Sequence, residues 1–485
     1  MINLNIKITR KGFTLLLLLI SIISFAQQKK WTLEECVNYA LENNISIQQS
    51  GLDVEQAEIN KKDAFGNFLP SLNASSNHSW NIGLNQNITT GLLENLTTQF
   101  TSFGLNSNVD IYRGLRNVNT LHRSNLAILA GQYQMDRMKD DTALAVANAY
   151  LQILFNREQL KVLKGQNQLT KENLKQTQEL IDAGVVPQGD ILELQATDAN
   201  QEQQIIASQN NLFLSKLSIA QLLQLRDYQN FDVETISYDL ITEDILEQNP
   251  SVIAERAKEE LNNIKIAQAN LELAEYDVKL AKGALLPTLS GFYSYSTRAS
   301  YSDRVLGFNQ TPDGTNRTIG FVENTGANVL TPNFTSSPII EGAAPLFDQF
   351  SLNDGHNFGL QLNVPIFNGF ASKNNVSRNE VNLERSKFQL EQANLDLEAA
   401  VYQAYNDAKN AKQAFNAATK TANAREQAFE YINNRFVLGV INSFDFNQSK
   451  IQFENAQADV VRTKYDYIFR LKILEFYFGI PITQN

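Results

Sequence analysis

Two long stretches without proline, residues 115–182 and 370–437, constrain the fold of this 485-residue chain more than any other feature. Both are rich in helix-forming residues, and a helix rises about 1.5 Å per residue, so each would span about 100 Å. The mean helix of globular proteins is only about 11–12 residues long. No single globular core needs helices of this length, so the chain is not a string of ordinary globular domains.

The second stretch carries a regular seam whose members are spaced alternately by four and three residues. A sustained period of about 3.5 predicts packing of the coiled-coil type, and the many alanines allow neighbouring helix backbones to approach closely. Arg425 is the one member that breaks the apolar pattern. The seam consists of Leu397, Val401, Ala404, Ala408, Ala411, Phe415, Ala418, Ala422, Arg425, Phe429, Ile432 and Phe436.

Each long stretch ends in a similar corner, "GVVPQGD" at 184–190 and "GVINSFD" at 439–445. A glycine at this place predicts a C-cap, and the residues after it predict a new helix that returns along the first. A return helix of about 35 residues spans about 50 Å and covers only the distal half of its partner. The corners are therefore expected at the far tips of two helical hairpins.

Three further pairs of segments repeat in the same order, which predicts an internal duplication. They are "LENNISI" and "LEQNPSV", "FLPSLNAS" and "LLPTLSGF", and "NVDIYRG" and "NVPIFNG". The expected first repeat is 27–225, with helices in 33–65, strands at about 70–84 and 100–112, a long helix at 115–182 and a return helix at 190–224. After a linker at 226–245, the expected second repeat is 246–485, with helix 251–284, strands at about 287–298 and 355–367, a surface loop at 299–354, a long helix at 370–437 and a return helix at 443–476.

The N-terminal residues 1–26 are interpreted as a secretory signal peptide. Lys7, Arg10 and Lys11 precede a short apolar run, and small residues stand at the cleavage-reading positions Ser24 and Ala26. The single cysteine, Cys36, lies well past that run, so neither a lipoprotein nor an internal disulfide is expected. The net charge of −11 becomes more negative when the basic leader is removed, which disfavours nucleic acid as a partner.

Apolar and polar residues alternate between Asn357 and Ile366, which predicts a strand with two unlike faces. The alternation alone fits equally a sheet that covers a protein core and a strand of a membrane barrel, which needs about 9–11 residues. Four strands per chain cannot close a barrel, and lipid does not tolerate an open sheet edge. A membrane barrel would thus be shared, with eight strands from two chains or twelve from three, and the larger would hold an aqueous lumen.

The opening "TLEECVNYALENN", the paired "LPSL" and "LPTL", "VPIFNG" and the two corners together resemble the TolC-type outer-membrane efflux proteins, the outer membrane factor family. The resemblance covers essentially the whole mature chain. It implies an α + β membrane protein of the outer membrane of a Gram-negative-type envelope. Three copies would share a twelve-stranded β-barrel in the lipid, continued by a long periplasmic α-helical barrel with a mixed equatorial belt.

The resemblance also implies partners and sites. The tips would dock a periplasmic adaptor (membrane fusion) protein that serves an inner-membrane RND or ABC transporter. Asp445 matches the first of two acidic rings at the pore constriction, Gln448 stands neutral at the second, and Asp190 matches the acid of the first corner. A basic latch residue would fall on Ile441, so that latch is not expected. Adaptor docking is expected at Gly184, Val185, Gly439 and Val440.

Each of these residues also has a simpler role, since an Asp in a first helical turn stabilises the helix dipole and the glycines cap helices. No enzyme motif, metal-ligand spacing or cofactor motif occurs, and His78, His122 and His356 are scattered. Three functions remain open. They are an efflux duct for small molecules such as drugs, the exit duct of a type I protein secretion system, and a coiled-coil surface protein without a pore.

Overall fold

The computed structural model describes residues 30–86, 92–228, 230–235 and 244–480, so the expected signal peptide lies outside the described residues. The chain divides into two compact units. The first, here called the helical unit, comprises Met1–Ile59, Asn125–Glu275 and Val381–Asn485. The second, the sheet unit, comprises Asn60–Ser124 and Tyr276–Glu380.

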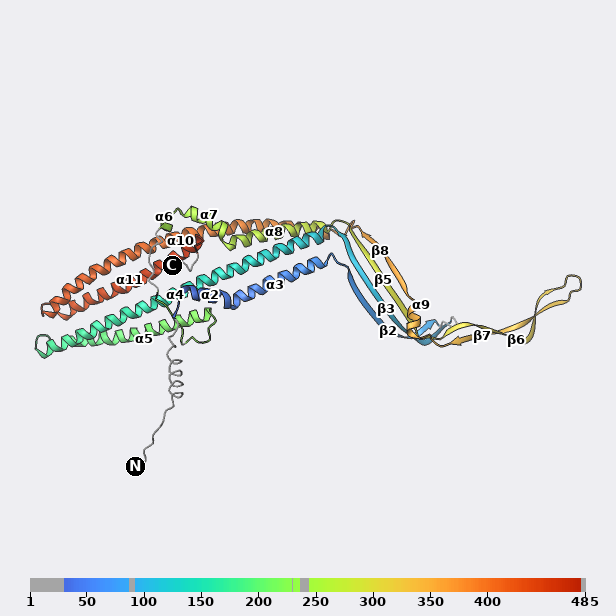
Figure 1. The fold of residues 1–485 in the computed structure, drawn as a ribbon, viewed down its shortest axis with the longest axis horizontal. Helices are drawn as coiled ribbons and strands as arrows, with labels where there is room; N and C mark the ends of the chain where they lie inside the picture. The colour runs from blue at the N-terminus through green and yellow to red at the C-terminus, as the bar shows by residue number, and fades with distance from the viewer. Residues whose placement is uncertain (1–29, 87–91, 229, 236–243, 481–485) are drawn as a thin grey trace, which may run out of the picture. The chain divides into compact units, whose positions relative to one another are not determined.

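Two helical hairpins dominate the helical unit. Helix α4 (Arg116–Asp182) is followed by α5 (Asp190–Leu222), and α10 (Ala371–Val437) by α11 (Ser443–Tyr477). Figure 1 shows α5 returning along the distal part of α4 and α11 returning along α10. The two long helices and their shorter return helices therefore have the arrangement that the corner motifs predict.

The seam of α10 is confirmed by its burial. Leu397, Val401, Ala404, Ala408 and Ala411 are at most 8% exposed, and Phe429 and Phe436 are also buried. The remaining members are half-buried, with the exception of Arg425, which is exposed and donates from Nη1 to Gln452 Oε1 at 2.6 Å. The one polar member of the seam thus bonds to the return helix instead of entering the core.

A second core surrounds α2 (Leu33–Asn43), which opens with a capping box. The Glu35 N–H donates to Thr32 Oγ1, and the Thr32 N–H donates to Glu35 Oε2, both at 3.1 Å. Nearby, β1 (Lys30–Trp31) pairs in parallel with β4 (Asp232–Val233), which lies in the predicted linker. Cys36 is a fully buried member of this core, as expected of a small apolar residue.

The prediction of a single helix at 251–284 is wrong in one respect, because the structure has two helices there. After the short α6 (Asp244–Glu247) come α7 (Pro250–Glu260) and α8 (Asn262–Gly283). Leu261 between them is extended, with ψ 133°, and its side chain is buried against α10 and α11. Neither proline nor glycine marks the break, which follows from packing. A similar extended residue, Asn44 with ψ 127°, separates α2 from α3 (Ile45–Gly66).

The sheet unit holds a four-stranded antiparallel sheet in the order β2-β3-β5-β8. Its strands are β2 (Ser71–Gln86), β3 (Leu93–Arg113), β5 (Thr288–Ser300) and β8 (Gly355–Asn363). Strand β3 begins before residue 100, the expected start. Strand β8 ends before residue 367, the expected end, because Pro365 has no N–H to donate to a neighbouring strand. Strands β2 and β8 are the two edges of this sheet.

The surface loop expected at 299–354 is wrong as a description of backbone structure. The segment contains β6 (Arg304–Phe321) and β7 (Asn328–Glu341), paired as an antiparallel hairpin, and helix α9 (Leu346–Leu352). Its Asn, Gly and Pro content suggested a loop. In the structure Asp313 and Gly314 instead form an irregularity within the ladder, and the pairing resumes at Asn316.

Corresponding corners of the two halves have the same backbone geometry. In the sheet unit, strand β3 leads into α4 through two left-handed residues, Gly114 (φ 59°) and Leu115 (φ 61°). The segment after β8 leads into α10 through Gly369 (φ 62°) and Phe370 (φ 66°). These pairs of positive φ angles fall in the repeated segments "NVDIYRG" and "NVPIFNG" or directly after them.

Candidate functional site: sheet faces and helical tip

One face of the four-stranded sheet is apolar. Paired residues share a face and successive residues alternate, so the register assigns each side chain to a side. The apolar residues of this side, here called the apolar sheet face, are Leu72, Trp80, Ile82, Leu84, Phe103, Leu105, Leu289, Tyr293, Tyr295, Phe358, Leu360 and Leu362. A smaller number of polar residues lie among them, including Ser76, His78, Gln99, Thr101 and His356. Ile82 is 82% exposed and Phe358 is 76% exposed. The alternative in which this sheet covers a core of its own chain is therefore wrong, because the described residues do not bury these side chains.

The opposite face is mainly polar. It comprises Asn73, Ser75, Asn77, Ser79, Asn81, Ser102, Asn106, Asn108, Ser290, Ser294, Ser296, Asn357, Gln361 and Asn363. Ser294 Oγ donates to Asn106 Oδ1 at 2.7 Å across neighbouring strands. Phe292 is an exception, and its ring lies beside Gly359, where a Cβ would come within 3.1 Å. The sheet thus separates an apolar side from a side that water can wet.

None of the helices in the described part of the chain combines the length and hydropathy needed to cross a membrane.

Both helical tips close with the same hydrogen bonds. Gly184 (φ 75°) donates to the Ile181 carbonyl and Val185 to Leu180, while Gly439 (φ 72°) donates to Phe436 and Val440 to Arg435. This pairing is the Schellman motif, in which glycine supplies the left-handed conformation. The four residues proposed for adaptor docking, Gly184, Val185, Gly439 and Val440, are all exposed.

The two tips lie against each other. A Cβ added to Gly439 would lie 3.5 Å from Val185 Cγ1. Exposed apolar side chains surround this point, with Val185 56% and Val440 60% exposed. Two corners that are far apart in sequence therefore form one small apolar surface.

A hollow of about 630 Å³ lies beside the tips, between the first turns of α5 and α11. Its lining residues are Gly189, Asp190, Glu193, Phe444, Asn447, Gln448, Ile451 and Gln452. The structure therefore brings Asp190 and Gln448 together, but exposed Asp445 is not part of this lining. Glu193 was missed by the sequence reasoning, although its spacing of three from Asp190 places both carboxylates on one helix face.

Asp445 lies in the first turn of α11, where its role as a cap neighbour is visible. Asn442 is the N-cap, and its Oδ1 accepts from the Asp445 backbone N–H at 2.8 Å. Asn442 Nδ2 in turn donates to Asp445 Oδ2 at 3.1 Å. The carboxylate is thus held at the start of the helix, where the helix dipole favours a negative charge.

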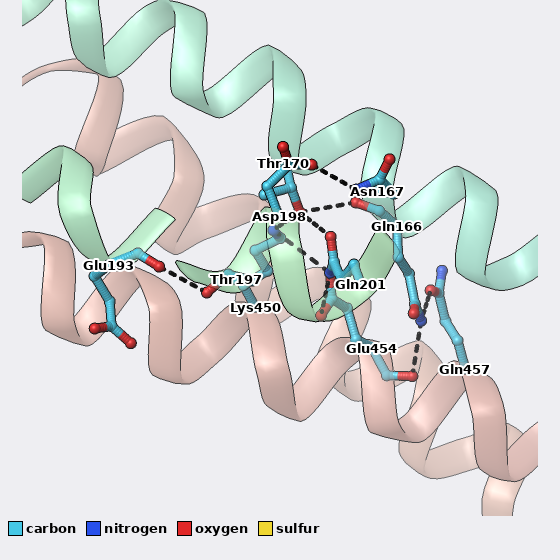
Figure 2. A network of polar contacts seen from close by, with 10 residues as sticks. All are labelled: Gln166, Asn167, Thr170, Glu193, Thr197, Asp198, Gln201, Lys450, Glu454 and Gln457. Carbon is cyan, nitrogen blue, oxygen red and sulfur yellow. Dashed lines mark hydrogen bonds and ion pairs between the residues drawn. The ribbon is translucent and has the colours of Figure 1, made fainter. Parts of the chain in front are cut away.

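Below the tips, a buried polar layer joins α4, α5 and α11 (Figure 2). Lys450 is 1% exposed, donates to Thr170 Oγ1 and lies 3.5 Å from Glu454 Oε1. Gln201 Nε2 donates to both carboxylate oxygens of Glu454, at 3.1 and 3.3 Å, and Thr170 Oγ1 donates to Gln201 Oε1 at 2.6 Å. Gln166 Nε2 adds a bond to the Glu454 carbonyl at 3.1 Å.

Burial perturbs both charged members of this layer. It lowers the pKa of Lys450, although the nearby Glu454 carboxylate acts in the opposite direction. It raises the pKa of Glu454, against the effects of Lys450 and the Gln201 hydrogen bond. An aromatic cluster lies on the tip side of the layer, where the rings of Phe436 and Phe446 stack with centroids 4.4 Å apart. The layer is thus a buried ion pair inside an otherwise packed helical end.

Sequence reasoning missed this layer because Lys450 and Glu454, four apart on a helix, have the spacing of an ordinary surface pair. One signal was present, since Leu194, Gln201, Ser208 and Ser215 recur at intervals of seven on α5 and are all buried. No group of three His, Cys, Asp or Glu side chains suited to a metal occurs among the residues that the structure describes.

Solved outer-membrane channels share this fold. The outer membrane protein VceC from Vibrio cholerae aligns with a TM-score of 0.70 at 14% identity, over 92% of this chain and 96% of VceC. The Campylobacter jejuni CmeC outer membrane channel also aligns at 0.70, with 17% identity over 93% of this chain and 86% of CmeC. This chain therefore has the same fold as these two solved proteins.

The sequence defines the family. The family model described as outer membrane efflux protein matches residues 36–223 and 253–479, and the chain belongs to this family. Outer membrane protein TolC of Escherichia coli K12 is 20% identical over 88% of this chain and 78% of its own. Proteases secretion protein PrtF of Dickeya chrysanthemi is 21% identical over 70% of this chain, and the match spans 64% of PrtF. The resemblance drawn from the sequence motifs is confirmed.

Proposed function

We propose that this chain forms the outer-membrane exit duct of a tripartite efflux pump that exports small molecules such as drugs or other toxic compounds. The observation that carries the proposal is the four-stranded sheet with two open edges, one apolar face and one polar face. Lipid would cover the apolar sheet face, and the polar face would line a water-filled lumen.

The open edges of β2 and β8 support assembly with other copies, because unpaired backbone groups are costly in hydrocarbon. Pairing β2 of one copy with β8 of the next, three times around, gives a closed twelve-stranded barrel in a homotrimer. The helical hairpins of three copies would continue it as a periplasmic helical barrel. The matched corners in the two halves of the chain, and the two segments matched by the family model, support an internal duplication.

The surface of the helical tips supports a proposal about the partner proteins. The exposed apolar surface formed by Val185 and Val440 supports docking of a periplasmic adaptor, which would connect the duct to an inner-membrane RND or ABC transporter. The glycines at Gly184 and Gly439 leave room for the backbone of a partner's helical tip. Transport through such a duct involves no bond chemistry, so no catalytic residue or cofactor is assigned.

Assembly is the first prediction. The protein extracted from outer membranes in mild detergent should have the mass of three chains, because a single chain leaves both sheet edges open. Mass photometry or sedimentation of the detergent complex measures this directly. A monomer that retains its helix and strand content by circular dichroism would contradict the shared barrel.

Ion selectivity tests the proposed constriction at the tip. Asp445→Asn should reduce cation selectivity and block by multivalent cations in planar bilayers, because three carboxylates near the axis attract cations. The Asn442 cap should survive, since its Oδ1 accepts from the backbone of residue 445. Gln448→Asp should have the opposite effect, and Asp190→Asn a smaller one. If Asp445→Asn and Gln448→Asp both leave selectivity unchanged, Asp445 only supports the helix turn.

A second candidate is the exit duct of a type I protein secretion system, favoured by the similarity to PrtF, a protein named for protease secretion. The two functions differ in what a deletion strain loses. Loss of the duct should increase sensitivity to toxic small molecules if it serves an efflux pump. It should instead abolish export of a specific protein if it serves secretion.

A further inference from the structure

The β6–β7 hairpin of the sheet unit carries its aromatic side chains Phe308 and Phe334 on one and the same face. The register, with its irregularities on β6, assigns side chains of both strands to this face. The side that we call the hairpin apolar face carries Val305, Phe308, Pro312, Leu330, Phe334, Pro338 and Ile340, and the polar residues Gln310, Asn316, Thr318 and Ser336 lie among them. The opposite side carries mainly polar and charged residues, namely Arg304, Asn309, Thr311, Arg317, Thr331, Thr335, Ser337 and Glu341, together with Val329 and Ile339. One face of the hairpin is therefore more apolar than the other and carries no charge, whereas the other face is charged.

This face is open in the single chain. Phe308 is 59%, Phe334 48% and Ile340 55% exposed. The two strands form a sheet of their own, and neither pairs with a third strand among the described residues. An isolated two-stranded hairpin is marginally stable in water, and a contiguous exposed apolar patch generally marks an interaction site. The hairpin therefore needs a cover for its apolar face.

The hairpin is nevertheless held together by side-chain hydrogen bonds and an ion pair, in addition to its backbone pairing. Asp313 Oδ1 accepts from the backbone and hydroxyl of Thr315, and Asp313 Oδ2 accepts from Asn333 Nδ2 at 3.0 Å across the ladder. Arg304 and Glu341 form an ion pair at the base, at 2.9 Å. Helix α9 anchors the root, because Gln349 Nε2 donates to the Ser300 carbonyl at 2.9 Å.

Lipid does not fit as the cover. Burial of the hairpin in hydrocarbon would leave two open strand edges without hydrogen-bond partners. Addition of a strand from another protein is disfavoured as well, because Pro312, Pro332 and Pro338 interrupt both edges and have no N–H to offer. The partner must therefore pack on the face and not along an edge.

A second copy of the same hairpin fits these requirements. The hairpin apolar face contains no charged side chain, so identical faces can meet without repulsion. The chain leaves β7, forms α9 and enters β8 directly. β8 is the edge strand that joins the next copy in the proposed trimer. The root of each hairpin therefore adjoins the proposed boundary between copies, and the trimer would bring three hairpins to the same end of the barrel.

We propose that the hairpin apolar faces of three copies pack on one another and form a closed bundle at the outer mouth of the duct. This inference rests on the proposed trimer. The polar sides of the hairpins then face water, and the aromatic rings of Phe308 and Phe334 fill the centre of the bundle.

Cross-linking between copies tests the proposal. Single variants Phe308→Cys, Phe334→Cys and Leu330→Cys are compared with Asn309→Cys and Thr335→Cys, which lie on the polar side of the same strands. A short bismaleimide is added to whole cells, and linked chains are read on denaturing gels. We expect at least a tenfold higher yield of linked chains from the apolar side. The native Cys36 is buried and serves as the background in wild type.

Each variant is also weighed in mild detergent without cross-linker. Equal yields from the two sides, in variants that are trimers by mass, overturn the proposal and leave the duct function intact. A monomeric wild type instead overturns the proposed trimer itself. Deletion of 304–341 provides a second measurement, since an open mouth should raise single-channel conductance in bilayers. Unchanged conductance of the trimeric deletion variant contradicts a closed bundle.

Discussion

Alanine at Gly114 should destabilise the sheet unit by about 2–5 kcal/mol, from backbone strain of about 1–2 kcal/mol and overpacking of about 1–3 kcal/mol. Gly114 has φ 59°, and an added Cβ would lie 2.2 Å from the Gly283 carbonyl oxygen and 3.0 Å from Leu286 Cβ. The obstacle is backbone, which cannot rotate away as a side chain would. Strand β3 and the end of α8 would therefore have to separate.

Gly369→Ala is the matched control for this prediction. Gly369 has nearly the same backbone angle, φ 62°, but no atom lies within 4 Å of the added Cβ. It should lose only the strain of a left-handed alanine, about 1–2 kcal/mol. Amide hydrogen exchange of β3 and α8 in the purified protein reports local opening, which is better defined here than global unfolding. Equal losses in the two variants would show that the contact with Gly283 contributes nothing.

Removing the charge of Lys450 should lower the free energy of local opening of the helical end by about 3–5 kcal/mol, because the largely buried Glu454 would lose its ionic partner. In Lys450→Met, the carboxylate keeps only the Gln201 hydrogen bonds, and its pKa is already raised by burial. The double variant Lys450→Met with Glu454→Leu should recover most of the loss, since apolar residues of similar volume can replace a buried pair. Hydrogen exchange of residues 165–177 and 446–458 measures both effects.

The ion pair Lys171–Glu202 provides the control, since it joins α4 and α5, two of the three helices in the layer, at the surface. Its atoms are 2.9 Å apart, but the side chains are 46% and 54% exposed. Lys171→Met should leave exchange at the tip nearly unchanged, because exposed ion pairs contribute little. If Lys450→Met increases hydrogen exchange at the tip as little as Lys171→Met does, the buried layer does not stabilise the tip.

The long helices, their capped corners and the α10 seam were predictable because each depends on residues close in sequence. A heptad spacing, a glycine at a C-cap and a Thr32–Glu35 capping box act within one or two turns, so the pattern contains the structure. The same holds for the alternation around Phe358 and Leu360, which specifies two unlike strand faces. Family resemblance added the expectation of a channel, and the family match confirms it.

Other features needed the tertiary structure because they depend on partners far away in the chain. The hairpin in 299–354 exists only because Arg304–Phe321 finds Asn328–Glu341, and composition could not distinguish such pairing from a loop. Leu261 breaks a helix to bury its side chain against α10 and α11. Lys450 has the sequence pattern of a surface lysine, but in the fold it is 1% exposed and donates to Thr170 on another helix. Local spacing thus determined the long helices and their caps, whereas burial, which depends on the surroundings of each side chain, decided which polar and apolar groups meet.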